Sequence, residues 1–153
     1  MGSCKLSCHD VAQYFLAQMD EDAGDLISNL KLQKLVYYAQ GFALALHGRP
    51  LFPEKIEAWM HGPVVPELYQ EYKPYGPDAI RHPGNLDFSI YDDQTRELLD
   101  EVYAVYGQFS AWKLRDMTHS EPPWRDAPPG QEIRHDDLAS YFAARVTREP
   151  EMA

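Results

Sequence analysis

The sequence lacks several features that define common protein classes. Only two cysteines, Cys4 and Cys8, occur in 153 residues, which is too few for a disulfide framework and is typical of reduced thiols in the cytoplasm. No window approaches the roughly 18 consecutive apolar residues that a membrane-spanning helix needs. No apolar signal-peptide core follows the first residues. We therefore expect a cytoplasmic protein that has no membrane partner.

Basic residues are also scarce. Fourteen Lys and Arg stand against 24 Asp and Glu, which gives a formal net charge of −10. Nucleic-acid binding depends on a basic surface that attracts phosphates, so this balance argues against a nucleic-acid partner. An acidic protein favours basic partners instead, because complementary charge steers association.

Patterns that carry catalysis are missing as well. The 9 glycines are scattered, so there is no Gly-rich phosphate loop, and no two histidines have the spacing of a helical metal site. Cys4, Cys8 and His9 make an incomplete ligand set, which leaves a zinc site or a metal-dependent hydrolase as a minor alternative. Paired acids such as Asp92–Asp93 and Asp136–Asp137 are typical of helix caps. We predict no catalytic, cofactor-binding or metal-binding residues, and hence no enzyme.

Helical periodicity dominates what is present. Apolar residues recur at helical spacing from Val11 to Met19, and a run from Leu32 to Leu46 follows the i, i+3, i+4, i+7 rule, capped by Ser28 or Asn29 and ended by Gly48. Further helices are predicted near 66–73, 93–106, 110–116 and 137–146, with Trp112 and Leu114 facing inward in the third of these. Residues 118–130 are expected to be irregular.

These elements predict a mainly α fold. We expect a single compact helical domain over residues 1–153, with a small two- or three-stranded β element (α+β) around Glu57–Met60. The tail at 147–153 is expected to be frayed, because chain ends without packing partners lose order.

The helix over 30–46 is the one locally positive element. No Asp or Glu lies between Leu26 and Pro53, whereas Lys31 and Lys34 lie inside this stretch. The helix macrodipole disfavours cations near a helix N-terminus. The two lysines are therefore expected either to be neutralised by the acidic loop at 20–25 or to bind a partner.

Adjacent tyrosines on the same helix point in different directions. Tyr37 and Tyr38 are separated by about 100° around the helix axis, so we expect that they do not both enter the core. Tyrosine is common at protein interfaces, because it offers a large contact area and one polar group. The pattern favours a binding protein over an enzyme.

Several short motifs follow one another along the chain. In order, they are Leu30-Lys31-Leu32-Gln33-Lys34-Leu35-Val36-Tyr37-Tyr38-Ala39-Gln40-Gly41, Pro50-Leu51-Phe52, Ile56-Glu57-Ala58-Trp59, His61-Gly62-Pro63-Val64-Val65-Pro66 with Tyr69, Thr118-His119-Ser120-Glu121 with Pro123-Trp124, and Tyr141-Phe142. Together they resemble the Panacea, or SocA-like, antitoxin domain. The resemblance spans roughly residues 9–144.

This resemblance implies a bacterial or prophage-encoded antitoxin. Such a protein binds and neutralises the protein toxin of a neighbouring gene by direct contact and without catalysis. An alternative that the resemblance also implies is a proteolytic adaptor that delivers the toxin to a ClpXP-type protease. The family is associated with many unrelated toxins, so the identity of the toxin stays open. We predict that the toxin-binding region contains Lys31, Gln33, Lys34, Tyr37 and Tyr38, with Trp59, His61 and Tyr69 beside them.

Overall fold

The computed structural model describes residues 5–20, 22 and 24–152, with side chains up to residue 146. The strands β1 (Glu57–Trp59) and β2 (Gly62–Val64) form a small antiparallel sheet, and two 3-10 turns are η1 (Lys73–Tyr75) and η2 (Phe88–Ile90). The helices are α1 (Cys8–Gln18), α2 (Asn29–His47), α3 (Pro66–Tyr72), α4 (Asp93–Tyr106), α5 (Ala111–His119), α6 (Pro122–Arg125) and α7 (His135–Met152). This architecture confirms the predicted mainly helical α+β fold.

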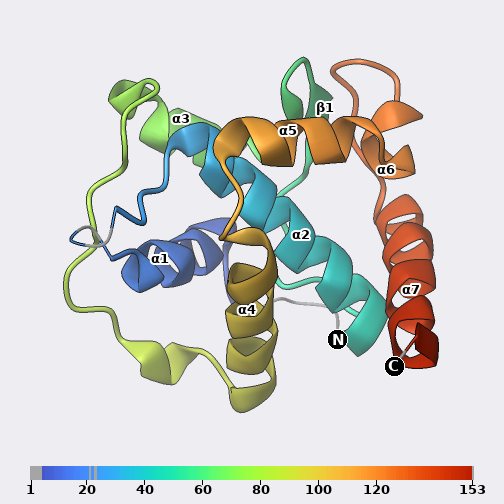
Figure 1. Cartoon of the computed structure of the whole chain (residues 1–153), viewed down its shortest axis with the longest axis horizontal. Helices are drawn as coiled ribbons and strands as arrows, with labels where there is room; N and C mark the ends of the chain where they lie inside the picture. The colour runs from blue at the N-terminus through green and yellow to red at the C-terminus, as the bar shows by residue number, and fades with distance from the viewer. Residues whose placement is uncertain (1–4, 21, 23, 153) are drawn as a thin grey trace.

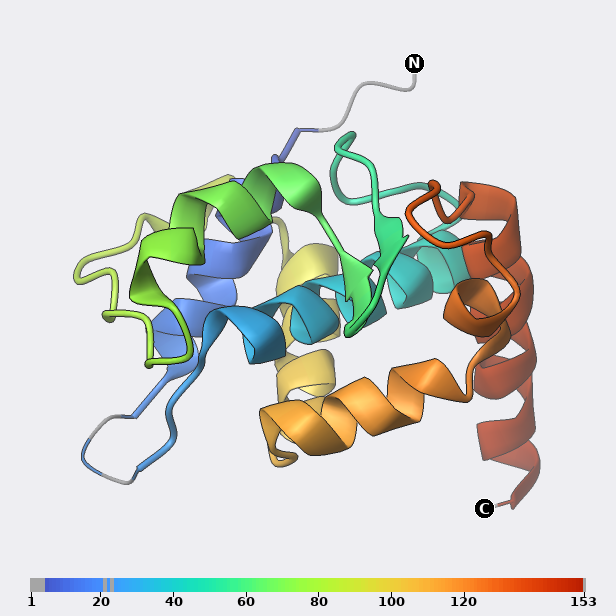
Figure 2. The ribbon, with the colours of Figure 1, turned by 90° about the horizontal axis from the view of Figure 1, so that it is seen from above.

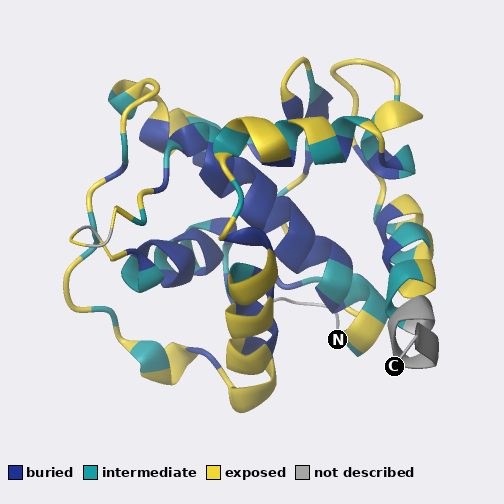
Figure 3. Ribbon diagram, viewed as in Figure 1, coloured by how far each residue is buried: buried dark blue, intermediate teal, exposed yellow. Residues whose placement is uncertain are grey.

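Helix α2 runs through the middle of the molecule. It packs against α1, α3, α4, α5, α7 and β2. Figure 1 shows it crossing the molecule diagonally, and Figure 2 shows α3 on one side of it and α5 on the other. Every residue from 31 to 41 is buried, and the dark blue of α2 in Figure 3 marks this segment. Over residues 31–41 the helix is therefore buried around its whole circumference, whereas Leu46, the last residue of the predicted apolar run, is exposed.

Local capping signals place most helix ends. The Ser28 side chain accepts a hydrogen bond from the amide of Lys31, and Gly48 ends α2 in the left-handed conformation with φ of 71°. Ser7 and Asp10 form a capping box at the start of α1, and Asp92 caps α4 as predicted. These ends follow from side chains that bind free backbone amides.

Three boundaries differ from the prediction. Helix α7 begins at His135, so that Asp136 and Asp137 lie in its first turn, where carboxylates favour the positive end of the helix dipole. It continues to Met152 and does not end near residue 147. The segment expected to be irregular contains α6, because the Pro122 ring suits the first turn of a helix.

The two strands form a hairpin with Met60 and His61 at its turn. Glu57 pairs with Val64 and Trp59 with Gly62. The other edge of β1 is covered by residues 130–133, since the amide of Ala58 donates to the carbonyl of Gln131 at 2.9 Å. Both edges of β1 are therefore paired, which fixes the position of the hairpin turn.

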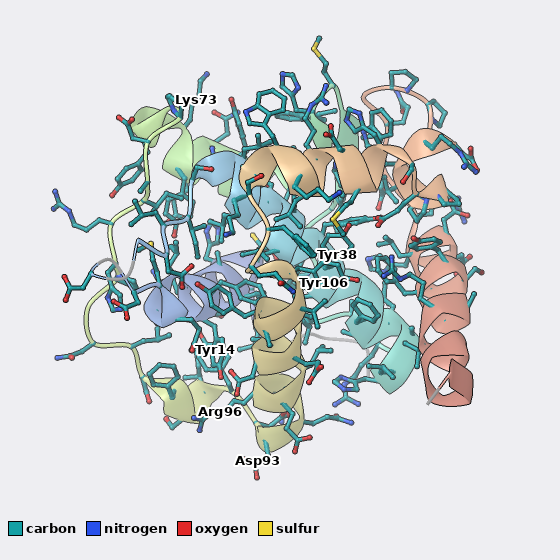
Figure 4. All side chains as sticks on the ribbon, viewed as in Figure 1. Tyr14, Tyr38, Lys73, Asp93, Arg96 and Tyr106 are labelled. Carbon is teal, nitrogen blue, oxygen red and sulfur yellow. The ribbon has the colours of Figure 1, made fainter. Side chains whose placement is uncertain are left out.

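Aromatic side chains join α1, α2 and α4. The rings of Tyr38 and Tyr106 stack with centroids 3.9 Å apart, and the two residues lie beside each other in Figure 4. The Tyr14 hydroxyl donates to Asp100 Oδ1 at 2.6 Å, which links α1 to α4. Among the described helices, none is long and apolar enough to cross a membrane.

Candidate protein-binding site

Polar side chains of residues 31–41, here called the signature segment, hold other parts of the chain. Lys31 Nζ donates to the carbonyl of Gly107 at 2.7 Å, just beyond the end of α4. The Gln40 amide donates to the carbonyl of Phe52 at 2.9 Å and accepts from the amide of Leu51 at 2.7 Å. These side chains therefore satisfy backbone groups that would otherwise be buried without a partner.

The same segment fixes the hairpin. Gln33 Oε1 accepts from the amide of Val65 at 2.9 Å, and Lys34 Nζ donates to the carbonyl of Pro63 at 3.1 Å. Gly62 has φ of +113°, and a Cβ atom at this position would lie 2.5 Å from Lys34 Cε. Glycine thus allows β2 to approach the lysine stem directly.

A buried carboxylate joins α2 to the segment after α5. Glu121 Oε1 accepts a hydrogen bond from the hydroxyl of Tyr37 at 2.9 Å and Oε2 accepts one from Tyr38 at 2.8 Å, and Arg145 Nη1 of α7 lies 3.5 Å from Oε2. Burial raises the pKa of Glu121, an effect that the two hydroxyls and Arg145 oppose. Burial and the Glu121 charge raise the pKa of both tyrosines.

The structure therefore corrects the view of the signature segment as an exposed patch. Lys34, Tyr37 and Tyr38 are 0% exposed, and Lys31 and Gln33 are buried as well. The expectation that Tyr37 and Tyr38 do not both enter the core is wrong, because other helices cover both side chains. Both rings contact Phe142 of α7 edge-on, at 5.6 Å and 6.0 Å, and Tyr38 also stacks on Tyr106 of α4. In this structure none of the five presents a contact surface, and all five position other segments.

The buried ammonium of Lys34 predicts a stability that rises with pH. Burial, together with the nearby Arg115, lowers the pKa of Lys34 to about 7, from an ordinary value of 10.5. The unfolded chain then binds this proton more tightly, so the free energy of unfolding should increase above pH 7 by up to about 1.4 kcal/mol per pH unit.

Urea denaturation between pH 7 and 8.5 measures this effect. Lys34→Met keeps the length of the side chain without its charge, and subtracting its profile removes the contributions of other groups. We expect the wild type to gain about 1–2 kcal/mol relative to Lys34→Met across this range. Parallel profiles would show that Lys34 is not the group that titrates.

An exposed aromatic surface surrounds the hairpin turn, on the part of the chain that the signature segment holds in place. Met60 is 77% exposed and Trp112 is 58% exposed. All three tryptophans of the chain take part in it. We call this the hairpin surface and define it by Trp59, Met60, His61, Tyr69, Trp112, Arg115 and Trp124.

On one side of the turn, the hairpin residue His61 packs against Trp112 and Arg115 of α5. The rings of His61 and Trp112 meet edge to face at 5.6 Å, and the Arg115 guanidinium lies 5.0 Å from the centroid of Trp112. Arg115 Nε also donates to His61 Nδ1 at 3.1 Å. The prediction that Trp112 faces inward is wrong, because Leu114 fills the core and a residue two positions away points to the opposite side of a helix.

The other side of the turn is a hollow of about 660 Å³. Trp59 and Trp124 line it, and Trp124 Nε1 donates to the carbonyl of Trp59 at 2.7 Å. The Trp124 ring is parallel to that of His119, with centroids 3.9 Å apart, and Trp59 meets Tyr69 edge-on at 5.0 Å. The remaining lining residues are Ala58, Met60, Arg125, Ala127, Pro129 and Gly130.

The hairpin surface brings together three of the eight sequence-predicted residues, namely Trp59, His61 and Tyr69. Sequence reasoning missed Met60 and Trp112 as exposed groups. The i, i+3 spacing of Trp112 and Arg115 on α5 is the signal that could have revealed Trp112, because such pairs share one helix face.

The chemistry of this surface is that of a protein interface. Trp, Tyr, Met and Arg are enriched in the cores of such interfaces and carry most of their binding energy. Among the described residues no group of three or more His, Cys, Asp or Glu could hold a metal ion. Of the zinc alternative, Cys4 lies outside the described residues, Cys8 is buried, and His9 pairs with Glu71.

Comparison with known proteins gives the family. Residues 32–125, more than half of the chain, match the model described as "Antitoxin SocA-like, Panacea domain". The chain belongs to this family. The matched region contains the signature segment from Leu32 onward and every residue of the hairpin surface.

One curated relative of this Panacea-domain chain is Antitoxin SocA of Caulobacter vibrioides (strain NA1000 / CB15N). The two are 36% identical over 109 residues. The match covers 64% of this chain and 58% of the relative, so the chain spans less than two thirds of the length of that protein. No solved structure matches this chain.

Proposed function

We propose that this chain is an antitoxin that binds and neutralises a cognate protein toxin through its hairpin surface, without catalysis. Membership of the SocA-like antitoxin family supports the antitoxin role. The observation that carries the binding mode is the exposure of Met60 on a hairpin that α2 holds in place, together with that of Trp112 on the adjacent helix α5.

A preorganised surface suits tight binding. The turn of the hairpin is fixed from below by Gln33 and Lys34 and from the side by the Trp124 hydrogen bond to Trp59. A rigid surface loses little conformational entropy on association. Burying large apolar side chains such as Met60 and Trp112 contributes about 1.5–3 kcal/mol each.

The predicted contact residues divide into two groups under this proposal. Trp59, His61 and Tyr69 are proposed to contact the toxin. The five residues of the signature segment are proposed to act indirectly, because they hold the hairpin and the segment around Glu121 in place. Neutralisation then occurs by occlusion of the toxin.

Co-expression tests the function. Each neighbouring reading frame is expressed alone and together with this chain in the same host, and growth is measured. One neighbour should arrest growth alone and be harmless with this chain, and the two proteins should co-purify. If every neighbour is harmless alone, or if the toxic one stays toxic, the antitoxin proposal fails.

The alternative role of a proteolytic adaptor has one observation in its favour. An adaptor holds its cargo with one surface and leaves another free for the protease. Exposed Leu46 and Val105 border a separate groove at the C-terminal end of α2, whereas the hairpin packs on its N-terminal half. An adaptor should shorten the half-life of the toxin in cells that contain a ClpXP-type protease but not in cells that lack it. An unchanged half-life leaves occlusion alone.

A further inference from the structure

The charge around the hairpin differs from that of the whole chain. The whole chain carries −10. On α5 the exposed or partly exposed Lys113 and Arg115 stand against Asp116, whereas beside the hollow Arg125 is paired with Asp126 at 3.0 Å and β1 adds the partly exposed Glu57. The α5 side of the hairpin surface is thus slightly positive on an otherwise acidic protein.

A further basic group lies directly beneath the hairpin. Lys34 Nζ is held by the carbonyl of Pro63, and within the part of the chain that the structure describes Lys34 forms no ion pair. The charge of Arg115 lowers the pKa of Lys34, and Arg115 and Lys34 add to the effect of burial in lowering the pKa of His119. The positive charge of Arg115 therefore disfavours the protonated forms of Lys34 and His119.

Of these basic groups, Arg115 is the one that a partner can contact at the surface. Its side chain is 24% exposed, and its guanidinium is oriented by His61 and by the Trp112 ring. Its ion pair is with Asp116, the next residue, at 3.2 Å, and the Asp116 side chain is 68% exposed. An ion pair this exposed is weak in water, so a better placed carboxylate can replace it with a charge-assisted pair.

Resting on the proposed function, we propose that the toxin presents a carboxylate beside an apolar side chain. The carboxylate pairs with Arg115, and the apolar side chain enters the hollow between Trp59 and Trp124. A lysine or arginine of the toxin at this position would instead face the positive charges of Arg115 and Lys113 on α5, and juxtaposed like charges disfavour association. The net charge of −10 favours a basic partner, whereas the contact surface favours an acidic segment.

Opposite changes of charge test this proposal. The probe is the neighbour-encoded toxin that the wild-type chain neutralises, and its affinity is measured by calorimetry. Asp116→Ser removes the acid that competes for Arg115 and should tighten binding about three- to fivefold. Lys113→Glu adds an acid at an exposed position of the same helix and should weaken binding by a similar factor.

Two matched controls lie far from the hairpin. Asp93→Ser at the start of α4 and Lys73→Glu in η1 make the same changes at exposed positions, and both residues are labelled in Figure 4. Their affinities should stay within about twofold of the wild type, and both effects at α5 should shrink with added salt. Unfolding curves of all four variants show whether each one folds.

The outcomes separate this inference from the proposed function. If the wild type neither binds nor protects, the proposed function fails. If it protects but the two effects have the opposite signs, the toxin contacts this surface with basic groups, and the inference is wrong. If it protects and the variants at Asp116 and Lys113 behave like their controls, no charge recognition takes place here, and the inference is equally wrong.

Discussion

Replacing Glu121 with alanine is expected to lower the free energy of unfolding by about 3–5 kcal/mol. The Glu121 side chain is 5% exposed and accepts the hydroxyls of Tyr37 and Tyr38. Its removal leaves two buried hydroxyls without an acceptor and the guanidinium of Arg145 without its counter-charge. The loss should also release the segment around Glu121 from α2, since the two tyrosines are its link to that helix.

Urea denaturation measures this loss of stability. Three further variants show how much of it comes from each tyrosine hydrogen bond and how much any exposed substitution costs. Tyr37→Phe and Tyr38→Phe each remove one hydrogen bond to a charged group and should cost about 1.5–3 kcal/mol. Glu132→Ala at an exposed position should change the free energy of unfolding by no more than about 0.5 kcal/mol. A loss below about 1 kcal/mol for Glu121→Ala would mean that the tyrosine hydroxyls do not depend on this carboxylate.

Gly41→Ala should destabilise the protein although alanine is the better helix former. In the middle of a helix the exchange normally contributes up to about 1 kcal/mol of stability. Here a Cβ atom would lie 2.2 Å from Cε2 of Phe142 on α7. Because α2 and α7 are in close contact at this point, overpacking should outweigh the propensity, with a net loss of about 3 kcal/mol.

A double-mutant cycle with Phe142→Ala separates the two effects. Phe142→Ala alone should cost about 3–5 kcal/mol as a buried truncation. In the Gly41→Ala background it should cost less, because it also relieves the overlap. If Gly41→Ala stabilises the protein, α7 does not pack on α2 as described.

Local signals in the sequence predicted much of the fold. Caps such as Ser28 and Asp92 act within three residues, so their effect can be read directly from the chain. The complete burial of residues 31–41 of α2 could not be predicted from such local signals. Its polar residues find partners far away in sequence, 29 residues for Lys34 and 84 for Tyr37, and lysine in isolation is usually exposed.

The candidate site was predicted only in part, because its contacts also join residues that are far apart in the sequence. The order of the motifs identified Trp59, His61 and Tyr69 as site residues. Hydrophobic periodicity, however, does not show which side of a short helix such as α5 packs against the core. The sequence pattern therefore predicts, wrongly, that Trp112 is a core residue. The buried lysines have a consequence for experiments, because variants at Lys31 or Lys34 disturb the fold and so do not isolate binding.

Affinity and protection by a Met60→Ser, Trp112→Ala variant test the central proposal most directly. Both side chains are largely exposed, so the free energy of unfolding should stay within about 1 kcal/mol of the wild type. Leu26→Ser with Ile90→Ser makes a similar change at exposed apolar residues elsewhere. We predict that the first pair weakens toxin binding by at least about 30-fold and abolishes protection, while the second pair protects fully. A folded Met60→Ser, Trp112→Ala variant that binds and protects like the wild type would contradict the hairpin surface as the toxin-binding site.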